Sequence, residues 1–218
     1  RLLNIRGCSI TIPHKIDIIP LLDKTSENVR EMGACNTLYR DGEKICGENT
    51  DVIGFTAPLR KRSLPPETRV LVLGAGGVSR AAIAGLRRLG LANITLTNRR
   101  KERAEALCNE FGLLCAPWEE RGDVPADLII NTTPLGMTGA QEHETPYPWA
   151  FQDNGIAYDL IYTPFQTRFL RDAAAAGWET VSGLDMFIGQ GDAQFHLWTG
   201  HHLPEEAITA VTSALYGQ

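Results

Sequence analysis

The chain has 218 residues, 43% of them hydrophobic and 22% charged, which is the composition of a globular protein with one large or two small domains and not of a disordered chain. Its 21 Lys and Arg against 26 Asp and Glu give a net charge of −5, which disfavours sequence-independent binding to nucleic acid because that binding needs an excess of basic side chains. No apolar run reaches the roughly 18 residues of a membrane span, and five cysteines without a C-x-x-C pair favour a reduced, cytoplasmic protein over a disulfide scaffold.

The first third of the chain mixes short apolar segments with turns and prolines. Four elements are expected here: a strand over 9–12, a short helix start over 16–22, a hairpin over 36–47 and a helix over 52–61. The strand rests on alternating polar and apolar residues and is ended by Pro13, and the hairpin rests on Asp41-Gly42, a favoured turn dipeptide.

A connector at 63–66 marks a predicted domain boundary, because the hydrophobic pattern changes after it. Buried-strand patterns then alternate with helical ones: strands over 69–73, 94–97, 127–130 and 157–161, and helices over 79–90, 101–111 and 165–176. This alternation with short connections predicts an α/β fold whose parallel sheet is covered by helices on both faces.

The chain ends in two predicted helices rather than in another strand. These helices span 185–198 and 204–216, and Pro204 suits the start of the second. The patterns therefore divide the chain into three parts: 1–62, 63–184 and 185–218.

The first strand of the predicted parallel sheet ends in a glycine turn that opens a helix. Gly74 permits a tight reversal, and Gly76 has no side chain, so a pyrophosphate can approach the backbone at the helix N-terminus. The last position of the usual G-x-G-x-x-G/A pattern is Ser79, a small residue but an imperfect match. The flanking strand and helix favour dinucleotide binding in a Rossmann-like domain, and a glycine-rich turn without a ligand is the alternative.

The end of the next strand indicates which dinucleotide would bind. NAD enzymes usually carry Asp or Glu there for the ribose 2′-hydroxyl, whereas residues 97–101 are Thr-Asn-Arg-Arg-Lys and Arg103 follows. Because guanidinium groups bind phosphate through two parallel hydrogen bonds, Arg99 and Arg103 predict a clamp on the 2′-phosphate of NADP. The alternative, a solvated basic helix start, is opposed by the helix dipole.

Two polar clusters in the first third are not explained by a hydrophobic core. One is Thr11 to Lys15, the other is Asn49 to Asp51, and Asn36 lies between them in the sequence. Reduction of a ketone needs a proton donor, and a lysine oriented by an aspartate can serve, while Thr and Asn can bind the hydroxyl groups of a polyol. Spacing alone does not show that Lys15 and Asp51 meet, so a surface lysine and a turn aspartate stay open.

Eight motifs occur in a fixed order along the chain. They are GCSITIPHK at 7–15, ACNT at 34–37, GENTDVIGF at 47–55, VLGAGGVSRA at 72–81, NR at 98–99, NTTPLGM at 131–137, YDLIYTP at 158–164, and GQ at 189–190 followed by Phe195 and Trp198. Together they closely resemble the shikimate dehydrogenase family over nearly the whole chain. Members of that family reduce 3-dehydroshikimate to shikimate with NADPH in the aromatic amino-acid pathway.

The resemblance implies a role for each matching residue. Lys15 would be the catalytic acid/base and Asp51 its partner. The substrate would be bound by Thr11, Asn36, Asp51, Tyr162 and Gln190. The cofactor NADP would be held by Gly74, Ala75, Gly76, Gly77, Val78, Asn98, Arg99, Arg103, Thr132, Met137, Gly183 and Met186. The resemblance implies no metal and a small-molecule partner, not nucleic acid or a membrane.

The resemblance also implies what the three parts of the chain do. The family's substrate domain normally begins with a further strand–helix segment that carries a serine pair for the substrate carboxylate, so residues 1–62 would be that domain without its N-terminal portion. Residues 63–184 would be the Rossmann-like NADP domain, and 185–218 would be helices that return to the substrate domain. A homodimer and a module of a larger multi-enzyme chain both stay open.

Two other functions stay open at this point. A sister enzyme would act on quinate or an amino analogue, with NAD as its cofactor, although the basic run after Thr97 counts against NAD. A non-catalytic metabolite sensor would keep the fold and regulate a partner. The presence of both Lys15 and Asp51 argues for an enzyme, because a sensor has no need of a proton donor.

Overall fold

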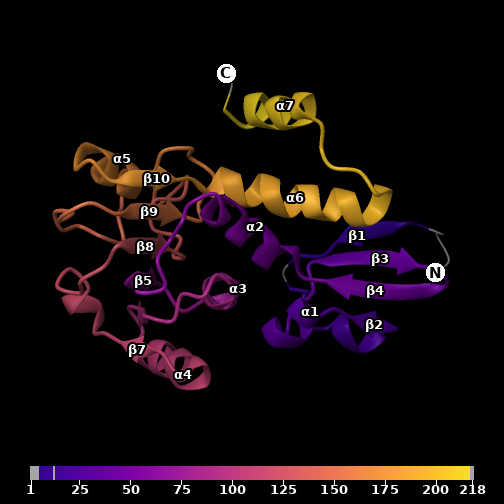
Figure 1. The fold of residues 1–218 in the computed structure, drawn as a ribbon, viewed down its shortest axis with the longest axis horizontal. Helices are drawn as coiled ribbons and strands as arrows, with labels where there is room; N and C mark the ends of the chain where they lie inside the picture. The colour runs from indigo at the N-terminus through magenta and orange to yellow at the C-terminus, as the bar shows by residue number, and fades with distance from the viewer. Residues whose placement is uncertain (1–4, 12, 217–218) are drawn as a thin grey trace.

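Two β-sheets lie at opposite ends of the molecule, with long helices running between them (Figure 1). The structure is a computed structural model and describes residues 5–11 and 13–216. One sheet has four strands in the order β1-β3-β4-β2, and the other has six in the order β10-β9-β8-β5-β6-β7. Within the described residues, no helix is long and apolar enough to cross a membrane.

The four-stranded sheet is built around the predicted hairpin. Its strands are β1 (Gly7–Ser9), β2 (Lys24–Thr25), β3 (Thr37–Asp41) and β4 (Lys44–Glu48). Strand β3 pairs antiparallel with both β1 and β4, while β2 pairs parallel with β4. Gly42 supplies the left-handed backbone that the turn requires, with φ of 61°.

The first strand lies earlier than the alternating pattern predicts. Pairing with β3 restricts it to Gly7–Ser9, and after one more backbone contact, from Ile10 N–H to Asn36 O at 2.7 Å, the chain turns. Ile12, the last residue of the predicted strand, lies outside the described residues. The connection to β3 holds a short 3₁₀ helix (Ile19–Leu21) and α1 (Glu27–Met32).

The six-stranded sheet is parallel throughout, which confirms the α/β class and the Rossmann-like arrangement. Its strands are β5 (Val70–Leu73), β6 (Ile94–Thr97), β7 (Leu114–Cys115), β8 (Leu128–Asn131), β9 (Ile156–Asp159) and β10 (Glu179–Val181). Alternate side chains of β5 enter two cores: Val70 and Val72 pack in one core, and Leu71 and Leu73 pack in the other with Phe169.

Helices cover both faces of this sheet. Helices α2 (Thr50–Arg60), α3 (Gly77–Arg88) and α4 (Lys101–Phe111) pack on one face, and α5 (Arg168–Ala175) packs on the other. Helix α4 ends where predicted, because Gly112 adopts the left-handed conformation that closes a helix. Helix α5 begins three residues later than predicted, after the Thr167 hydroxyl accepts a hydrogen bond from Leu170 N–H.

The short elements β7, β10, α1 and the 3₁₀ helix Trp118–Glu120 were not expected from the sequence, because two to six residues carry too little periodicity.

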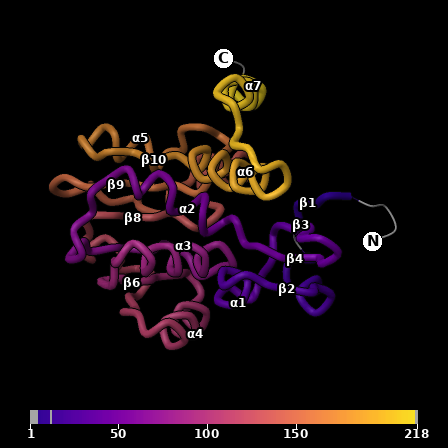
Figure 2. The backbone as a smooth tube through the Cα atoms, turned by 45° about the vertical axis from the view of Figure 1, so that its right-hand side comes forward, coloured from indigo at the N-terminus to yellow at the C-terminus, as the bar shows by residue number. Residues whose placement is uncertain are grey.

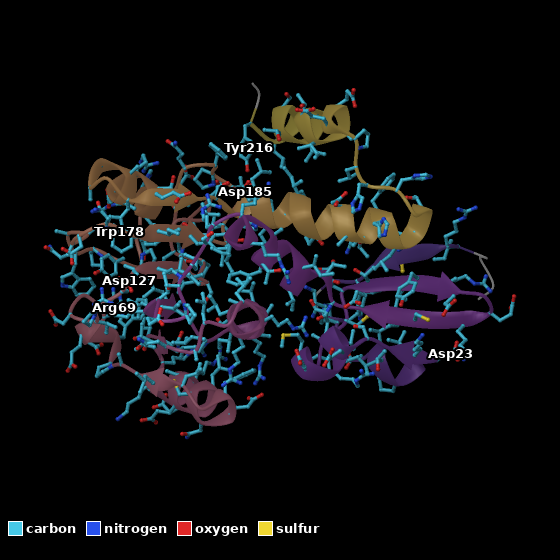
Figure 3. The ribbon with its side chains drawn as sticks, in the orientation of Figure 1. Asp23, Arg69, Asp127, Trp178, Asp185 and Tyr216 are labelled. Atoms are coloured by element: carbon cyan, nitrogen blue, oxygen red, sulfur yellow. The ribbon has the colours of Figure 1, made fainter. Side chains whose placement is uncertain are left out.

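The strand ends away from the four-stranded sheet carry an exposed ion pair. Arg69 precedes β5 and Asp127 precedes β8, and their side chains meet at 2.6 Å (Figure 3). This pair therefore marks the amino ends of the parallel strands, opposite the carboxyl ends where ligands bind such sheets.

Two helices connect the sheets, and they cross at glycine. Helix α6 (Gly183–Thr199) lies along α2, and α7 (Glu205–Tyr216) rests on the outer side of α6 without a buried residue (Figures 1 and 2). A Cβ built on Gly54 would lie 2.4 Å from Met186 O, and one built on Gly189 would lie 3.1 Å from Gly54 Cα. The two backbones therefore touch, and the crossing has no room for a side chain.

The sheets fall on either side of the predicted boundary near residue 62. The four-stranded sheet ends with β4, and the six-stranded sheet begins with β5, after α2 and the connector. Helix α6 then returns toward the four-stranded sheet (Figure 1). The division into 1–62, 63–184 and 185–218 itself stays a prediction.

The glycine crossing leads to a stability prediction. Gly54→Ala places a methyl group against the backbone of α6, and we expect it to lower the free energy of unfolding by about 1–3 kcal/mol through overpacking. Gly191→Ala is the matched control: nothing lies within 4 Å of its Cβ position, so the better helix propensity of Ala should raise stability slightly. Urea unfolding measures both variants. Equal effects would contradict the close crossing.

Candidate active site

Two cavities open at the carboxyl ends of the parallel strands. The glycine-turn cavity, of about 220 Å³, lies over the turn between β5 and α3. The cleft cavity, of about 560 Å³, lies between the two sheets and is lined by residues of both halves of the chain. The first turn of α3 separates them, because Gly76 lines the first cavity and Val78 the second. The chain adds strands on one side of β5 as far as β7 and then continues on the other side from β8. Open α/β sheets bind ligands at such a change of direction, here between β5 and β8.

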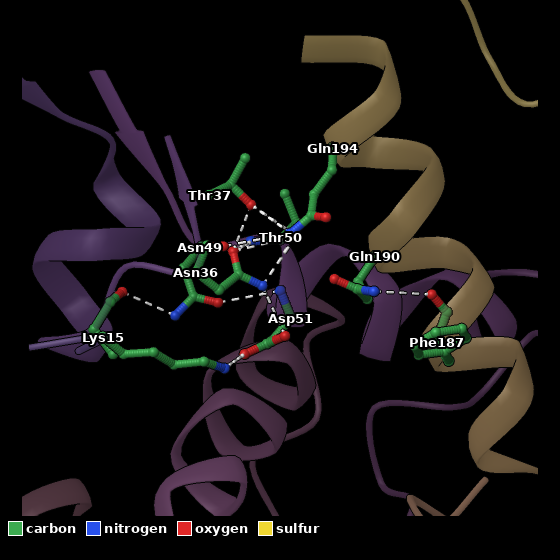
Figure 4. Close-up of polar contacts among 10 residues, drawn as sticks. Lys15, Asn36, Thr37, Asn49, Thr50, Asp51, Phe187, Gln190 and Gln194 are labelled. Carbon is green, nitrogen blue, oxygen red and sulfur yellow. Dashed lines mark hydrogen bonds and ion pairs between the residues drawn. The ribbon is translucent and has the colours of Figure 1, made fainter. Parts of the chain in front are cut away.

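The cleft cavity brings together the two polar clusters of the first third of the chain. Lys15 Nζ donates to Asp51 Oδ2 at 2.8 Å, and both side chains are mostly buried, with 28% and 21% of their surfaces exposed (Figure 4). The backbone fixes the lysine, since Cys35 N–H donates to Lys15 O at 2.7 Å. The ion pair is therefore held at the wall of a cavity and not on an open surface.

Asp51 is oriented from two sides. It lies in the first turn of α2, where the N-cap residue Asn49 accepts from Asp51 N–H through its side-chain oxygen, at 3.1 Å. A carboxylate in the first turn is favoured by the helix dipole. On the other side, Asn36 Nδ2 donates to Asp51 Oδ1 at 2.8 Å, which leaves Oδ2 for Lys15.

Helix α6 supplies the opposite wall of the cleft cavity. Gln190 and Gln194 lie one turn apart and both line the cavity; Gln190 Nε2 donates back to Phe187 O at 3.2 Å, whereas Gln194 reaches the four-stranded sheet (Figure 4). Gln194 is buried; its Nε2 donates to Thr37 Oγ1 at 2.9 Å, and its Oε1 accepts from Ser9 Oγ at 2.8 Å. Thr37 in turn donates to Asn36 Oδ1 at 2.7 Å, so a continuous hydrogen-bond chain joins α6 to the lysine–aspartate pair.

The glycine-turn cavity has the form of an anion cradle. Gly74 has φ of +115°, and a Cβ there would lie 2.5 Å from Thr132 Oγ1, so only glycine fits. Nothing lies within 4 Å of the Cβ positions of Gly76 and Gly77, which leaves open space over the start of α3. Ser79, the imperfect match, accepts from Gly76 N–H at 3.0 Å and shares a 2.7 Å hydrogen bond with Thr132, so its hydroxyl stabilises the turn.

Three arginines line the glycine-turn cavity at the start of α4. They are Arg99, Arg100 and Arg103. Within the part of the chain that the structure describes, none of them forms an ion pair with a carboxylate, whereas Lys101 pairs with Glu105 at 3.6 Å. Cations at a helix N-terminus are unfavourable unless an anion joins them. The cavity therefore fits a dinucleotide with an additional phosphate. It offers the N–H groups at the start of α3, open space above Gly76 and Gly77, and arginines without a carboxylate partner.

A buried carboxylate lies behind both cavities. Asp159, at the carboxyl end of β9, is fully buried, and this burial raises its pKa to about 7. Hydrogen bonds from Thr167, Ile161 N–H and Asn131 oppose that rise by favouring the ionised form.

The sequence-predicted residues divide between the two cavities. The predicted catalytic and substrate-binding residues all line the cleft cavity: Thr11, Lys15, Asn36, Asp51, Tyr162 and Gln190. The predicted cofactor residues that line the glycine-turn cavity are Gly74, Ala75, Gly76, Asn98, Arg99, Arg103 and Thr132. Val78, Gly183 and Met186 line the cleft cavity, while Gly77 and Met137 line neither.

Several lining residues were missed by sequence reasoning. In the cleft cavity they are Ser9, Ile10, Leu160, Phe187, Gly191 and Gln194, and in the glycine-turn cavity they are Arg100, Trp118, Thr133, Pro134, Leu135 and Gln141. A signal existed for Gln194, which lies four residues after Gln190 and so on the same helix face. A signal also existed for Arg100, inside the basic run. Trp118 and Gln141 are brought in by loops, and the sequence carries no periodic signal for them.

Comparison with known proteins gives a consistent set of relatives. Three family models match: the shikimate dehydrogenase substrate binding domain over residues 1–38, the shikimate / quinate 5-dehydrogenase model over 59–120, and the shikimate 5′-dehydrogenase C-terminal domain over 183–211. A shikimate dehydrogenase (NADP(+)) of Pelobacter propionicus is 56% identical over 220 residues, which cover 99% of this chain and 79% of that protein.

Two solved structures are informative neighbours. Shikimate 5-dehydrogenase of Thermus thermophilus, in complex with NADP(H) and shikimate, has a TM-score of 0.84 and 36% identity and covers 97% of this chain and 80% of its own. Quinate dehydrogenase of Corynebacterium glutamicum, in complex with NAD, has a TM-score of 0.90 and 30% identity, with coverage of 98% and 79%.

Proposed function

Because the chain belongs to the shikimate dehydrogenase family, we propose that it reduces 3-dehydroshikimate to shikimate with NADPH in aromatic amino-acid biosynthesis. The coarser assignment, an oxidoreductase of this family, follows from its curated relatives. The observation that carries the finer proposal is the 2.8 Å contact between Lys15 and Asp51 at the wall of the cleft cavity. The proposed location is the cytoplasm, which the free cysteines favour.

The proposed proton donor is Lys15. Bound NADPH supplies a hydride to the ketone carbon, and negative charge then develops on the ketone oxygen. The Lys15 ammonium gives one proton to that oxygen, which completes the alcohol and leaves a neutral amine; the reverse reaction uses the amine as the base. Asp51 holds the ammonium at 2.8 Å, and its own carboxylate is held by Asn36, so the donor is oriented before the substrate binds.

Binding of a polyol is the proposed role of the other cleft residues. Thr11, Tyr162 and Gln190 present hydroxyl and amide groups to the same cavity as Lys15, and such neutral groups can fix a hydroxylated ring by hydrogen bonds. Asn36 has both amide hydrogens committed, to Thr50 and Asp51, so we assign it mainly to orienting Asp51.

The glycine-turn cavity is the proposed site of the NADP phosphates. The open start of α3 would receive the pyrophosphate, with Gly74 and Gly76 allowing close approach. Arg99 and Arg103 would bind the 2′-phosphate, and Asn98 would lie beside the ribose. Val78 and Met186 line the adjoining cleft cavity, which suits an apolar contact with the nicotinamide.

The alternative substrate is quinate, with NAD. It is supported by the likeness to the quinate dehydrogenase structure, and the arginines in the glycine-turn cavity oppose it, because NAD carries no 2′-phosphate. A metabolite sensor is opposed by the oriented lysine–aspartate pair, which a binding protein would not require.

The function is tested by absorbance at 340 nm with shikimate or quinate and with NADP or NAD. We expect turnover with shikimate and NADP to exceed the other three combinations. Preference for quinate and NAD would favour the sister enzyme, and binding of shikimate without any turnover would favour the sensor.

Lys15→Ala should lower kcat by about a hundredfold or more, because it removes the proton donor. The Kd for NADPH should change little, since Lys15 does not line the glycine-turn cavity. Lys24→Ala is the matched control: Lys24 lies in β2 of the four-stranded sheet, is 62% exposed and does not line the cleft cavity, so this variant should leave kcat unchanged. Steady-state kinetics give kcat, and near-normal turnover by Lys15→Ala would remove Lys15 from the mechanism.

Arg99→Ala should weaken NADPH binding far more than NADH binding, by about tenfold or more for one lost charge-assisted contact. Lys101→Ala removes the same charge two residues away, from a side chain that pairs with Glu105 and does not line the cavity. It should affect both cofactors little. Fluorescence titration measures both dissociation constants, and equal losses for NADPH and NADH would argue against a 2′-phosphate contact.

A further inference from the structure

Asp159 lines neither cavity, but its carboxylate is held by hydrogen bonds. Its Oδ1 accepts from Ile161 N–H and from Asn131 Nδ2, both at 3.0 Å, and its Oδ2 accepts from Thr167 Oγ1 at 2.6 Å. Asn131 is its register partner on the neighbouring strand, at the carboxyl end of β8. Three donors from three segments of chain therefore converge on one buried group.

One of these donors leads to the wall of the glycine-turn cavity. Asn131 also forms hydrogen bonds with the residues that follow it. Its Oδ1 accepts from Thr133 N–H at 2.9 Å and from Thr133 Oγ1 at 2.7 Å, and its Nδ2 donates to Leu135 O at 3.2 Å. Thr133 and Leu135 both line the glycine-turn cavity. The position of Asn131 therefore sets the path of segment 132–135.

The other donors lead to the wall of the cleft cavity. Ile161 precedes Tyr162, which lines that cavity, and Ile161 O accepts from Gly183 N–H at the start of α6. Thr167 caps α5 and so fixes the far end of the same segment. The carboxylate thus holds segment 160–167 at its beginning and at its end.

The chemistry of the group matches this task. An ionised carboxylate only accepts, so it satisfies the N–H, the amide and the hydroxyl at once. Those donors come from β8, the segment after β9 and the cap of α5, and none of the three groups titrates. Burial opposes ionisation and raises the pKa to about 7, whereas a hydrophobic residue here would leave the three buried donors without their acceptor.

We propose that Asp159 is a positioning residue that holds one wall of each cavity in place: the wall of the glycine-turn cavity through Asn131, and the wall of the cleft cavity through Ile161 and Thr167. The identity of the two ligands rests on the proposed function. The coupling of segments 132–135 and 160–167 through Asp159 rests on geometry alone. Loss of these three hydrogen bonds should release segments 132–135 and 160–167 together, and so weaken the binding of two ligands that Asp159 does not contact.

The first test needs no ligand. Amide hydrogen exchange in the protein should be faster in both segments for Asp159→Ala than for wild type. Asp159→Asn should restore slow exchange, because its amide oxygen still accepts from Asn131 and Ile161 while its amide group donates to Thr167. Faster exchange in one segment only, or in neither, would overturn the proposal.

The second test measures binding of NADP and of shikimate separately. We expect Asp159→Ala to raise both dissociation constants by about tenfold or more, as small misplacements of a positioned wall do, and Asp159→Asn to recover both. Unchanged affinities in a merely less stable variant would overturn the proposal. Wild-type protein that binds neither ligand would refute the proposed function instead, and the exchange experiment would still decide on the coupling.

Two further variants keep the test decisive. If Asp159→Ala does not fold, Asn131→Ala takes its place. Amide exchange should become faster in segment 132–135 and less so in segment 160–167, because Asp159 still accepts from Ile161 and Thr167. Equal effects on the two segments, or no effect, would contradict the coupling. Thr68→Val is the matched control, since its buried hydroxyl bonds Pro65 O at 2.6 Å ahead of β5, at the other end of the sheet. It should lower stability and leave both affinities unchanged.

Discussion

The ion pair between Lys15 and Asp51 depends on three stretches of chain that are remote in sequence. The lysine follows β1 in an irregular segment, and the aspartate lies in the first turn of α2. Asn36, immediately before β3, donates to one oxygen of the carboxylate and so leaves the other for Lys15. The two side chains are 28% and 21% exposed at the wall of the cleft cavity, so water competes with the pair, and its geometry depends on the hydrogen bonds that orient each partner. The surrounding hydrogen bonds thus secure a charge arrangement that a mobile surface pair would not keep.

This local arrangement is tied to the whole molecule by helices that belong to both halves. Helix α2 carries Asp51 at one end and packs on the six-stranded sheet at the other, through Phe55 and Leu59. Helix α6 touches α2 at Gly54 and holds Gln194 against the four-stranded sheet. Because both walls of the cleft are anchored to the same pair of helices, a shift of one sheet would move the catalytic pair relative to the glycine turn.

Most of the fold could be predicted from local patterns, because its long elements carry strong periodicity. Helix α4 and strand β6 have the predicted bounds, and the hairpin follows from Asp41-Gly42. Most of the residues suggested for the site by family motifs line one of the two cavities, while Gly77 and Met137 line neither. The contacts between them could not be predicted: Gln194 and Asp159 act through partners 157 and 28 residues away, and no spacing rule connects such positions.

Tyr216, at the end of α7, has a consequence for spectroscopy. Its hydroxyl donates to Tyr162 O and its ring packs on Phe165 at 5.1 Å, while the rest of α7 stays at the surface. The last turn of this outer helix is thus attached to segment 160–167, which forms part of the wall of the cleft cavity. A fluorophore on the exposed side of that turn would sense movement of this segment from outside, and leave the reacting groups untouched.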